Sequence, residues 1–440
     1  MLRAVLSTAL ALAVLAGGLG PASAGPAAPV LATDLDNGLR VLLLEDRRSP
    51  IVSFQVWYRV GARNEARGVT GVAHFLEHMM FKGTPAHPRG EFARLVVQNG
   101  GHDNAATTMD WTSYYVDIAA DRVDLVIELE ADRMRNLVID PREVDSEREV
   151  VLEERRTRTE DDPGSYLGEE VNAVAYKAHP YGQPVIGWVE DVRKITAEQI
   201  RAFYRTYYVP NNAIVVAVGD FKAPELLAKI KARFGAIPRG AAPPPVLAVE
   251  PPQNGERRVT VKKQAQLPIV YLAWHVPDHG SPDAIPLEVL STIVSGGRAS
   301  RLFKRLVYER QIALDAGGDY SYLALDPPLF WFYATVMPAQ SPETVEQALL
   351  AEMDRLGREP VTDEELQRAK NQTEAAFVFA EDSVHSRAST LARFELIGGW
   401  ALAGDFVQRV RAVTAADVQR VARAWFLPDR KTAGVLLPLK

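Results

Sequence analysis

The sequence contains no cysteine, which excludes disulfide bonds and thiolate metal sites. It also lacks a basic surplus, because 50 Lys and Arg stand against 56 Asp and Glu and give a formal net charge of -6. Nucleic-acid-binding proteins normally carry such a surplus, so the composition disfavours that class. Histidine is scarce, with 8 among 440 residues, so any cluster of histidines stands out.

Beyond the N-terminus, no apolar run is long enough to span a bilayer. Residues 1–24 combine Arg3, an apolar run over 4–19 and the sequence Ala22-Ser23-Ala24, a pattern typical of a cleaved signal peptide. The run is shorter than the ~20 residues of a membrane anchor, so we expect cleavage after Ala24. Export of a cysteine-free chain predicts the periplasm of a Gram-negative bacterium, with full secretion as the alternative.

The rest of the chain divides into two halves on either side of a proline-rich stretch. Residues 236–255 carry six prolines and no helical period, which indicates an extended linker. Residue patterns predict two strands around a turn within 37–63, and one strand in each of the segments 104–119, 266–277 and 328–338. They predict helices at 90–101, 121–136, 141–160 and 283–294.

An internal repeat links the two halves. TAEQIRAFYRTYYVP (196–210) and TAADVQRVARAWFLP (414–428) place Thr-Ala, the late aromatics and the final proline in one register. An apolar strand pattern follows each of them. Unrelated capped helices are the alternative, since such signals are widespread. We predict an α+β fold of two homologous domains, 28–235 and 256–440, each a mostly antiparallel sheet covered by helices.

Residues 73–83, AHFLEHMMFKG, hold the densest group of possible metal ligands. On a helix, which turns about 100° per residue, His74, Glu77 and His78 project within about 100° of arc. Two imidazoles four residues apart can bind one tetrahedral Zn²⁺. Glu77 can then act as the general base that takes a proton from the attacking water. The alternative is an amphipathic helix with incidental polar residues, but its apolar neighbours predict burial, where such groups need partners.

A catalytic zinc site needs a third protein ligand from another element. The helix predicted over 141–160 offers Glu147, Glu149, Glu153 and Glu154. Glu147 and Glu154 share a helix face because they are seven residues apart. A solvated charged face is the alternative, and spacing alone does not choose among the four glutamates.

The motif H-x-x-E-H at 74–78, followed by E-R-x-x-x-x-x-E at 147–154, resembles the pitrilysin and insulin-degrading-enzyme family of inverted zinc metallopeptidases. The resemblance spans nearly the whole chain and is strongest to short bacterial members and the mitochondrial processing peptidase β subunit. In that family the third ligand follows the second histidine at the separation that Glu154 has from His78. The resemblance thus implies one Zn²⁺ held by His74, His78 and Glu154, with Glu147 orienting a ligand histidine.

The resemblance also implies how substrate is bound. It assigns Asn104 and Ala105 to the start of an edge strand that pairs with the backbone of the peptide, a recognised mode of peptide binding. On sequence alone, Asn104 reads equally well as a turn residue after Gly100 and Gly101. Residues 179–182, HPYG, are predicted to form a structural turn.

One family feature is missing. Family members carry an Arg in the second domain and a Tyr seven residues later, which hold the substrate near the zinc. Val307 and Leu314 occupy these positions here, and neither side chain donates a hydrogen bond. Arg301 and Tyr308 have the same spacing but lie six residues early, on another helix face.

We therefore predict a zinc metalloendopeptidase that cleaves peptides or unfolded segments. The resemblance implies that each chain is half of a clamshell, and the missing pair favours a heterodimer whose homologous partner supplies Arg and Tyr. A homodimer that uses other donors is the alternative. A non-catalytic assembly subunit of the same fold and a peptidase dedicated to one precursor are the rival functions.

Overall fold

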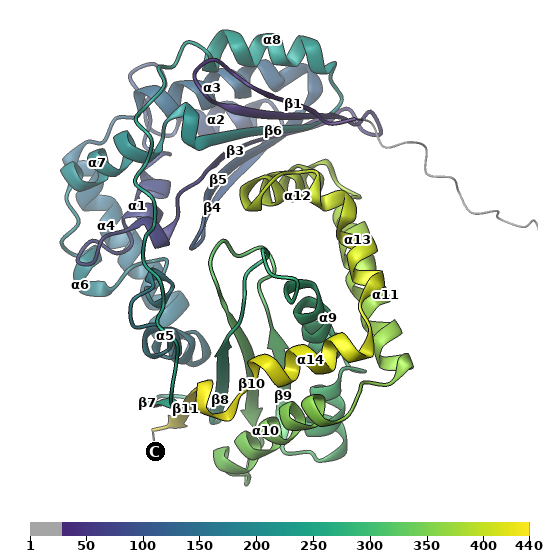
Figure 1. Cartoon of the computed structure of the whole chain (residues 1–440). Coiled ribbons are helices and arrows are strands. Elements are labelled where there is room, and N and C mark those ends of the chain that lie inside the picture. The colour runs from purple at the N-terminus through teal and green to yellow at the C-terminus, as the bar shows by residue number, and fades with distance from the viewer. Residues whose placement is uncertain (1–28, 440) are drawn as a thin grey trace, which may run out of the picture.

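The computed structural model describes residues 29–439, so the predicted signal peptide of residues 1–24 lies outside the described residues. Two mixed, mostly antiparallel sheets covered by helices confirm the predicted α+β class (Figure 1). The first sheet contains six strands: β1 (Leu31–Asp34), β2 (Arg40–Glu45), β3 (Ile51–Tyr58), β4 (His102–Thr107), β5 (Thr112–Ala119) and β6 (Ala213–Gly219). The second contains five: β7 (Arg257–Lys263), β8 (Ile269–His275), β9 (Ala313–Asp319), β10 (Leu329–Val336) and β11 (Lys431–Pro438).

The two sheets share one strand order. The first runs β1-β2-β6-β3-β5-β4 and the second runs β7-β11-β8-β10-β9. Without β1, the two orders are the same when strands are counted along each half. With β1 again left out, the last strand of each sheet pairs parallel to the first, as β6 does with β2 and β11 with β7. The repeated segments at 196–210 and 414–428 correspond to one another in this topology, since α7 (Ala197–Tyr207) leads into β6 and α14 (Ala415–Trp425) into β11.

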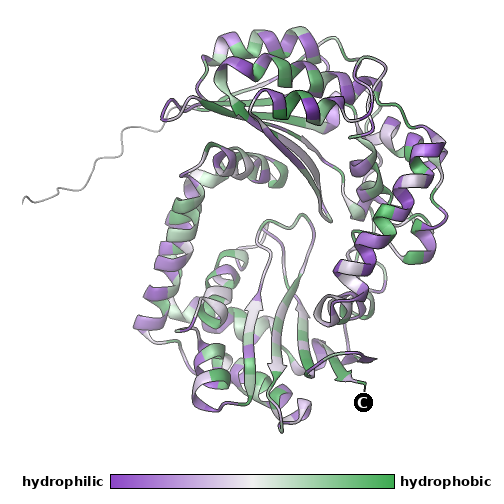
Figure 2. Ribbon diagram, turned by 180° about the vertical axis from the view of Figure 1, so that it is seen from behind, coloured by the Kyte–Doolittle hydropathy of each residue, from purple (hydrophilic) through white to green (hydrophobic). Residues whose placement is uncertain are grey.

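Helices cover the outer face of each sheet. Over the first sheet they are α1 (Val72–Met79), α2 (Glu91–Gln98), α3 (Val123–Asn136), α7 and α8 (Ala223–Phe234), with α4 (Pro141–Arg155) and the short α6 (Val189–Val192) packed beyond α1. Over the second sheet they are α9 (Ala284–Ser295), α10 (Pro342–Arg358) and α14. Hydrophobic and hydrophilic residues alternate along these helices, as expected for helices with one buried face (Figure 2).

One helix from each half of the chain packs on the sheet of the other half. Helix α12 (Val384–Ile397), which α11 (Asp363–Ala380) and α13 (Leu402–Ala412) flank in sequence, packs on the inner face of the first sheet against Leu42, Trp57 and Val216. Helix α5 (Pro163–Ala175) packs on the second sheet against Ala273 and Leu436. Strands β2 and β6 are therefore buried on both faces, which explains their unbroken apolar sequences.

The segment predicted as one strand over 104–119 is a hairpin, so that prediction was wrong in detail. Strands β4 and β5 meet at a turn in which the hydroxyl of Thr108 accepts hydrogen bonds from the backbone N–H groups of Asp110 and Trp111. This side chain stabilises the turn without glycine or proline. As a result β4 becomes the edge of the sheet, where one side of its backbone has no neighbouring strand.

The proline-rich linker lacks regular secondary structure, and the helix predicted over 141–160 ends in a π-helical turn. Residues 238–254 have no regular secondary structure, in agreement with the proline-rich sequence. Helix α4 ends at Arg155 and continues as a π-helical turn over Arg156–Glu160. Within residues 29–439, none of the helices combines the length and the apolar character needed to cross a bilayer.

Candidate metal centre

Helix α1 carries the H-x-x-E-H motif, and one buried glutamate fixes its start. Both oxygens of Glu65 accept backbone hydrogen bonds, one from Gly71 and one from Ala73, each at 2.8 Å. Gly71 has φ of +90°, and a Cβ there would lie 2.6 Å from the carbonyl oxygen of Ile186. Only glycine fits both requirements. The helix therefore begins at a defined position and direction against the loop that contains Ile186.

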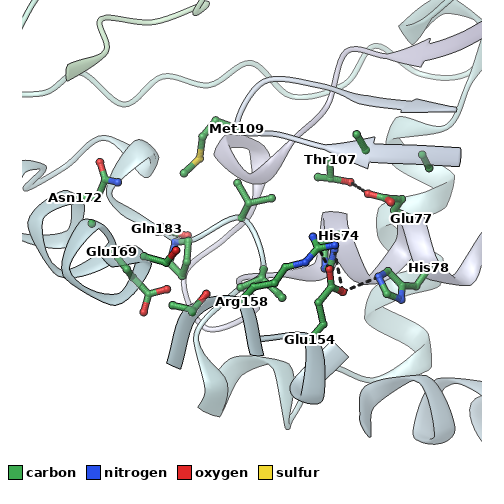
Figure 3. A pocket seen from close by; sticks show the side chains of 18 of the residues that line it. His74, Glu77, His78, Thr107, Met109, Glu154, Arg158, Glu169, Asn172 and Gln183 are labelled. Atoms are coloured by element: carbon green, nitrogen blue, oxygen red, sulfur yellow. Dashed lines mark hydrogen bonds and ion pairs between the residues drawn. The ribbon is translucent and has the colours of Figure 1, made fainter. Parts of the chain in front are cut away.

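The side chains of His74, His78 and Glu154 converge on one point between α1 and α4 (Figure 3). One ligand atom from each lies within 4.8 Å of the others. Oε2 of Glu154 is 3.2 Å from Nε2 of His78 and 3.7 Å from Nε2 of His74. Two imidazole nitrogens and one carboxylate oxygen are a donor set that Zn²⁺ accepts, with a fourth position left open.

A hydrogen bond fixes the edge of the His78 imidazole that points away from Glu154. Nδ1 of His78 donates a hydrogen bond of 2.8 Å to Oε1 of Glu147. The other carboxylate oxygen of Glu147 pairs with Lys82, four residues after His78. This arrangement directs Nε2 of His78 toward Glu154, as outer carboxylates do for metal-binding histidines.

The electrostatics of this group fit a metal site. Burial, and then the charge of His78, lowers the pKa of His74 to about 4, so His74 is neutral. Burial also opposes protonation of His78, but its hydrogen bonds to Glu147 and Glu154 outweigh this and raise its pKa to about 9. Nδ1 of His74 is buried and finds no hydrogen-bond partner within residues 29–439. A cation that replaces the His78 proton at Nε2 would neutralise Glu154 and would also meet Nε2 of His74, which faces the same carboxylate oxygen.

Glu77 lies on the same helix face with its carboxylate in the pocket. Oε2 of Glu77 accepts a hydrogen bond from the hydroxyl of Thr107, at the end of β4. Burial raises the pKa of Glu77, and the hydrogen bond from Thr107 opposes this shift. A carboxylate whose pKa is raised toward neutrality is better suited to take and return a proton.

These groups open into a groove of about 920 Å³. One wall is β4, from Asn104 to Thr107, and the opposite wall is formed by α5 and residues 183–186. Asn104 is exposed and Ala105 half-buried on this edge strand, so Asn104 is not a turn residue. The edge of β4 that no strand covers borders this groove, and there the backbone N–H of Ala105 donates a hydrogen bond of 2.9 Å to the side chain of Asn104, which a bound peptide would replace.

Sequence reasoning missed four residues around this group. Thr107 and Glu65 approach α1 from other elements and carry no motif that marks them. Lys82 and Arg158 could have been found by spacing, because each is four residues after a predicted ligand. Nη1 of Arg158 lies 2.7 Å from Oε1 of Glu154, and its side chain is 73% exposed along the groove (Figure 3).

The structure also places the residues at the positions of the missing Arg and Tyr, and the predicted HPYG turn. Val307 is half-buried and Leu314 is 57% exposed, and neither offers a side-chain hydrogen bond. Arg301 is paired with Glu365 at 2.8 Å, and Tyr308 is 75% exposed. The HPYG segment forms a 3₁₀ turn, Pro180–Gly182. Its His179 contacts Asp326 of the second half at 3.1 Å, so the turn joins the two halves.

Comparison with known proteins agrees with this geometry. Residues 40–188 match the family described as Insulinase (Peptidase family M16), and residues 194–373 match the Peptidase M16 inactive domain. The chain is 32% identical over 409 residues to the zinc protease PqqE of Helicobacter pylori, covering 92% of each protein. These matches show that the chain belongs to peptidase family M16, which confirms the predicted resemblance.

Two solved structures show the same architecture. The crystal structure of a protease from Helicobacter pylori has a TM-score of 0.91 and 31% identity, with 94% of this chain and all of that chain covered. The periplasmic protease PqqL from Escherichia coli has a TM-score of 0.75 and 20% identity, with 93% of this chain but only 47% of that chain covered. In fold, this chain therefore corresponds to one half of PqqL.

Proposed function

We propose that this chain is a zinc metalloendopeptidase that hydrolyses peptides or unfolded segments. The observation that carries the proposal is the convergence of His74, His78 and Glu154 beside Glu77 at the base of one groove. Relatives named zinc proteases support the choice of metal. We assign one Zn²⁺ to these three ligands and place the catalytic unit within residues 28–235, with the linker over 236–255 and the second unit over 256–440.

The residues have complementary roles in this proposal. Zinc, when bound, supplies a Lewis acid that polarises the scissile carbonyl. The carboxylate of Glu77 accepts a proton from the attacking water and returns it to the leaving amine. Thr107 fixes the orientation of that carboxylate through its hydrogen bond. The β4 edge at Asn104 and Ala105 pairs with the peptide backbone and so fixes the scissile bond over the site.

We further propose that the chain works with a second, homologous chain that closes the groove into a chamber. Two observations support this. Val307 and Leu314 cannot hold a substrate carbonyl, so the donors must come from elsewhere. The fold also corresponds to one half of the longer PqqL chain, which leaves the equivalent of a second half to be supplied by a partner.

A homodimer is the competing arrangement, and Arg158 favours it. Its guanidinium lies in the groove next to Glu154 and offers further N–H donors from the chain itself. The non-catalytic subunit remains the rival from another class, and the complete set of His74, Glu77, His78 and Glu154 argues against it. A peptidase dedicated to one precursor would share this site and differ in the range of peptides cleaved.

We also propose that the protein acts in the periplasm. The signal-like residues 1–24 and the absence of cysteine support export, and PqqL, whose fold is shared, is described as a periplasmic protease. Full secretion is the alternative.

Metal analysis and peptide cleavage test the main proposal together. We expect the purified chain to contain about one zinc per molecule and to cleave a library of unstructured peptides, because the site has three ligands and one base. A chelator should abolish cleavage and added zinc should restore it. Addition of a co-expressed homologue that carries the missing Arg and Tyr should raise activity if the partner is a different chain. A zinc-loaded protein that cleaves nothing, alone or with a partner, would refute the catalytic function.

A further inference from the structure

A second cavity, of about 340 Å³, lies between α5 and the second sheet, next to the zinc groove. Three aromatic side chains form its sheet side, and residues of α5 form its helix side. Figure 1 shows α5 beside the second sheet. We call this cavity the aromatic pocket. The residues that define it are Tyr271, Trp331, Tyr333, Gly164, Gly168 and Asn172.

The aromatic side chains cluster on a sheet face that is only partly covered. Tyr271 of β8 and Tyr333 of β10 are direct cross-strand partners, with ring centroids 6.5 Å apart. Trp331 is 5.9 Å from Tyr271 by the same measure. All three are half-buried, because α5 packs mainly on β7 and β11 and covers β8 and β10 only in part. A concentrated apolar surface of this kind typically marks a binding site.

Two glycines keep the helix side of the aromatic pocket open. Gly164 and Gly168 are four residues apart on α5 and both border Tyr271. A Cβ at Gly168 would lie 3.6 Å from the Tyr271 ring, an ordinary contact distance, and one at Gly164 would lie 3.3 Å from its hydroxyl oxygen. Packing therefore does not demand glycine at 168, although glycine weakens a helix interior. Because Gly164 and Gly168 have no side chains, space for a ligand remains between α5 and the aromatic rings.

The aromatic pocket is continuous with the zinc groove. Ser165, Gly168 and Asn172 border both cavities. An extended peptide that lies along the zinc groove would therefore pass the mouth of the aromatic pocket. We infer that the aromatic pocket is a substrate subsite that receives one aromatic or large aliphatic side chain of such a peptide. This inference rests on the proposed function and adds a substrate preference to it.

The lining favours an apolar side chain over a charged one. The only charged residue that borders the aromatic pocket is Asp162, within the residues that the structure describes. Its carboxylate caps α5 by accepting a hydrogen bond of 2.6 Å from the backbone N–H of Ser165. It is therefore engaged in the helix cap, while Tyr271, Trp331 and Tyr333 present apolar ring surface. Burial of a large apolar side chain against these rings is the favourable interaction.

Peptide binding without cleavage tests this inference. We would use the full chain with Glu77→Gln and two fluorescein-labelled Gly-Ser peptides that differ only in one central residue, Phe or Ala. Fluorescence anisotropy should show that the Phe peptide binds roughly tenfold more tightly, as burial of one large apolar side chain predicts. Gly168→Leu, which fills the aromatic pocket, and Tyr271→Ala, which removes one wall, should each abolish most of this difference.

Gly404→Leu is the matched control. Gly404 is also a helical glycine, in α13, and no atom lies within 4 Å of its would-be Cβ. This variant should keep the full preference for Phe. Equal affinity of the Glu77→Gln chain for both peptides, or a preference that survives the addition of Gly168→Leu and of Tyr271→Ala, would overturn the subsite. Cleavage by zinc-loaded wild-type protein, alone and with the homologous partner, tests the peptidase function separately. A Phe preference without cleavage in either case would support the subsite while refuting the peptidase.

Discussion

Nδ1 of His78 lies 2.8 Å from Oε1 of Glu147, which itself is held by Lys82. One side of the imidazole is thus fixed by a buried carboxylate, while the other side faces Glu154 at 3.2 Å. Glu147 is not one of the three residues whose ligand atoms converge, so its contribution is to fix the direction of the His78 ring. Loss of an outer carboxylate of this kind typically lowers metal affinity by roughly 10- to 100-fold.

Removal of Glu147 should weaken zinc binding without removing a ligand. We expect Glu147→Ala to lower zinc affinity roughly 10- to 100-fold, as measured by competition with a chromogenic chelator. Glu147→Gln keeps an oxygen acceptor for Nδ1 and should lose less. Glu149→Ala is the control, because Glu149 is exposed on the same helix. An unchanged zinc affinity in Glu147→Ala would show that His78 does not need this support.

The proposed base can be separated from the proposed ligands. Glu77→Gln keeps the size of the side chain and an acceptor for the Thr107 hydroxyl, but it removes the proton acceptor. We expect normal zinc content and a fall in turnover of at least ~10²- to 10⁴-fold. Metal analysis and a peptide-cleavage assay on the same preparation would check both. Near-full activity in this variant would rule out Glu77 as the base.

Glu153 and Glu154 provide a direct test of the third ligand. Glu154 faces the two histidines, whereas Glu153 is exposed and pairs with Arg156. We expect Glu154→Ala, like His74→Ala and His78→Ala, to lose tight zinc binding, because only two protein ligands would remain. Glu153→Ala should retain it. The reverse result, with zinc lost in Glu153→Ala and kept in Glu154→Ala, would contradict the assignment.

The sequence predicted the histidines and the base but could not choose the third ligand by spacing. An H-x-x-E-H pattern places its three side chains on one helix face whatever surrounds it, so local geometry was enough. For the four glutamates of α4, the choice depends on how α4 packs against α1. That packing buries Glu147, brings Glu154 to the histidines and leaves Glu149 and Glu153 in solvent.

Contacts between distant elements account for most of what the sequence did not predict. Thr107 reaches Glu77 because the hairpin of β4 and β5 folds beside α1. The sequence pattern predicted a single strand there instead of a hairpin. Its turn, Thr108–Trp111, contains no glycine or proline and depends on the Thr108 hydroxyl. The exchange of α5 and α12 between the sheets was equally hidden, since helix patterns show that a face is buried but not what covers it.

Glu288 predicts a pH dependence of stability far from the metal centre. Burial, and then the nearby charge of Asp319, raises its pKa to about 7, while Arg393 opposes the shift. The pKa of a glutamate in the unfolded chain is about 4.3. Protonated Glu288 therefore stabilises the fold, and this contribution is complete below about pH 4.3 and is lost as the pH rises through about 7.

Glu288→Gln should remove this dependence because the amide does not titrate. Melting temperatures recorded from pH 5 to 8 should fall more steeply for the wild-type protein than for Glu288→Gln, with a difference of a few degrees at the upper end. Glu364→Gln is a suitable control, as Glu364 is 90% exposed in its side chain. Parallel curves for wild type and Glu288→Gln would show that Glu288 ionises normally.

Arg158 decides whether the chain supplies its own donor for the substrate carbonyl. Its guanidinium uses one nitrogen on Oε1 of Glu154, and the rest of this largely exposed group borders the groove. An exposed ion pair of this kind contributes little to stability, so the position of Glu154 should survive its loss. If Arg158 stabilises charge on the carbonyl oxygen, Arg158→Met should lower kcat/KM of the isolated chain by roughly 10²- to 10³-fold.

The control for Arg158→Met is Arg156→Met, which breaks a similar ion pair on the solvent side of the same segment. Arg156→Met should leave both zinc content and kcat/KM unchanged. Arg158→Lys keeps the charge but not the planar fork, and it should recover only part of the activity. If Arg158→Met cleaves peptides as well as the wild type does, the donor comes from another chain. The homologous partner with the Arg and Tyr that Val307 and Leu314 replace would then be required for full activity.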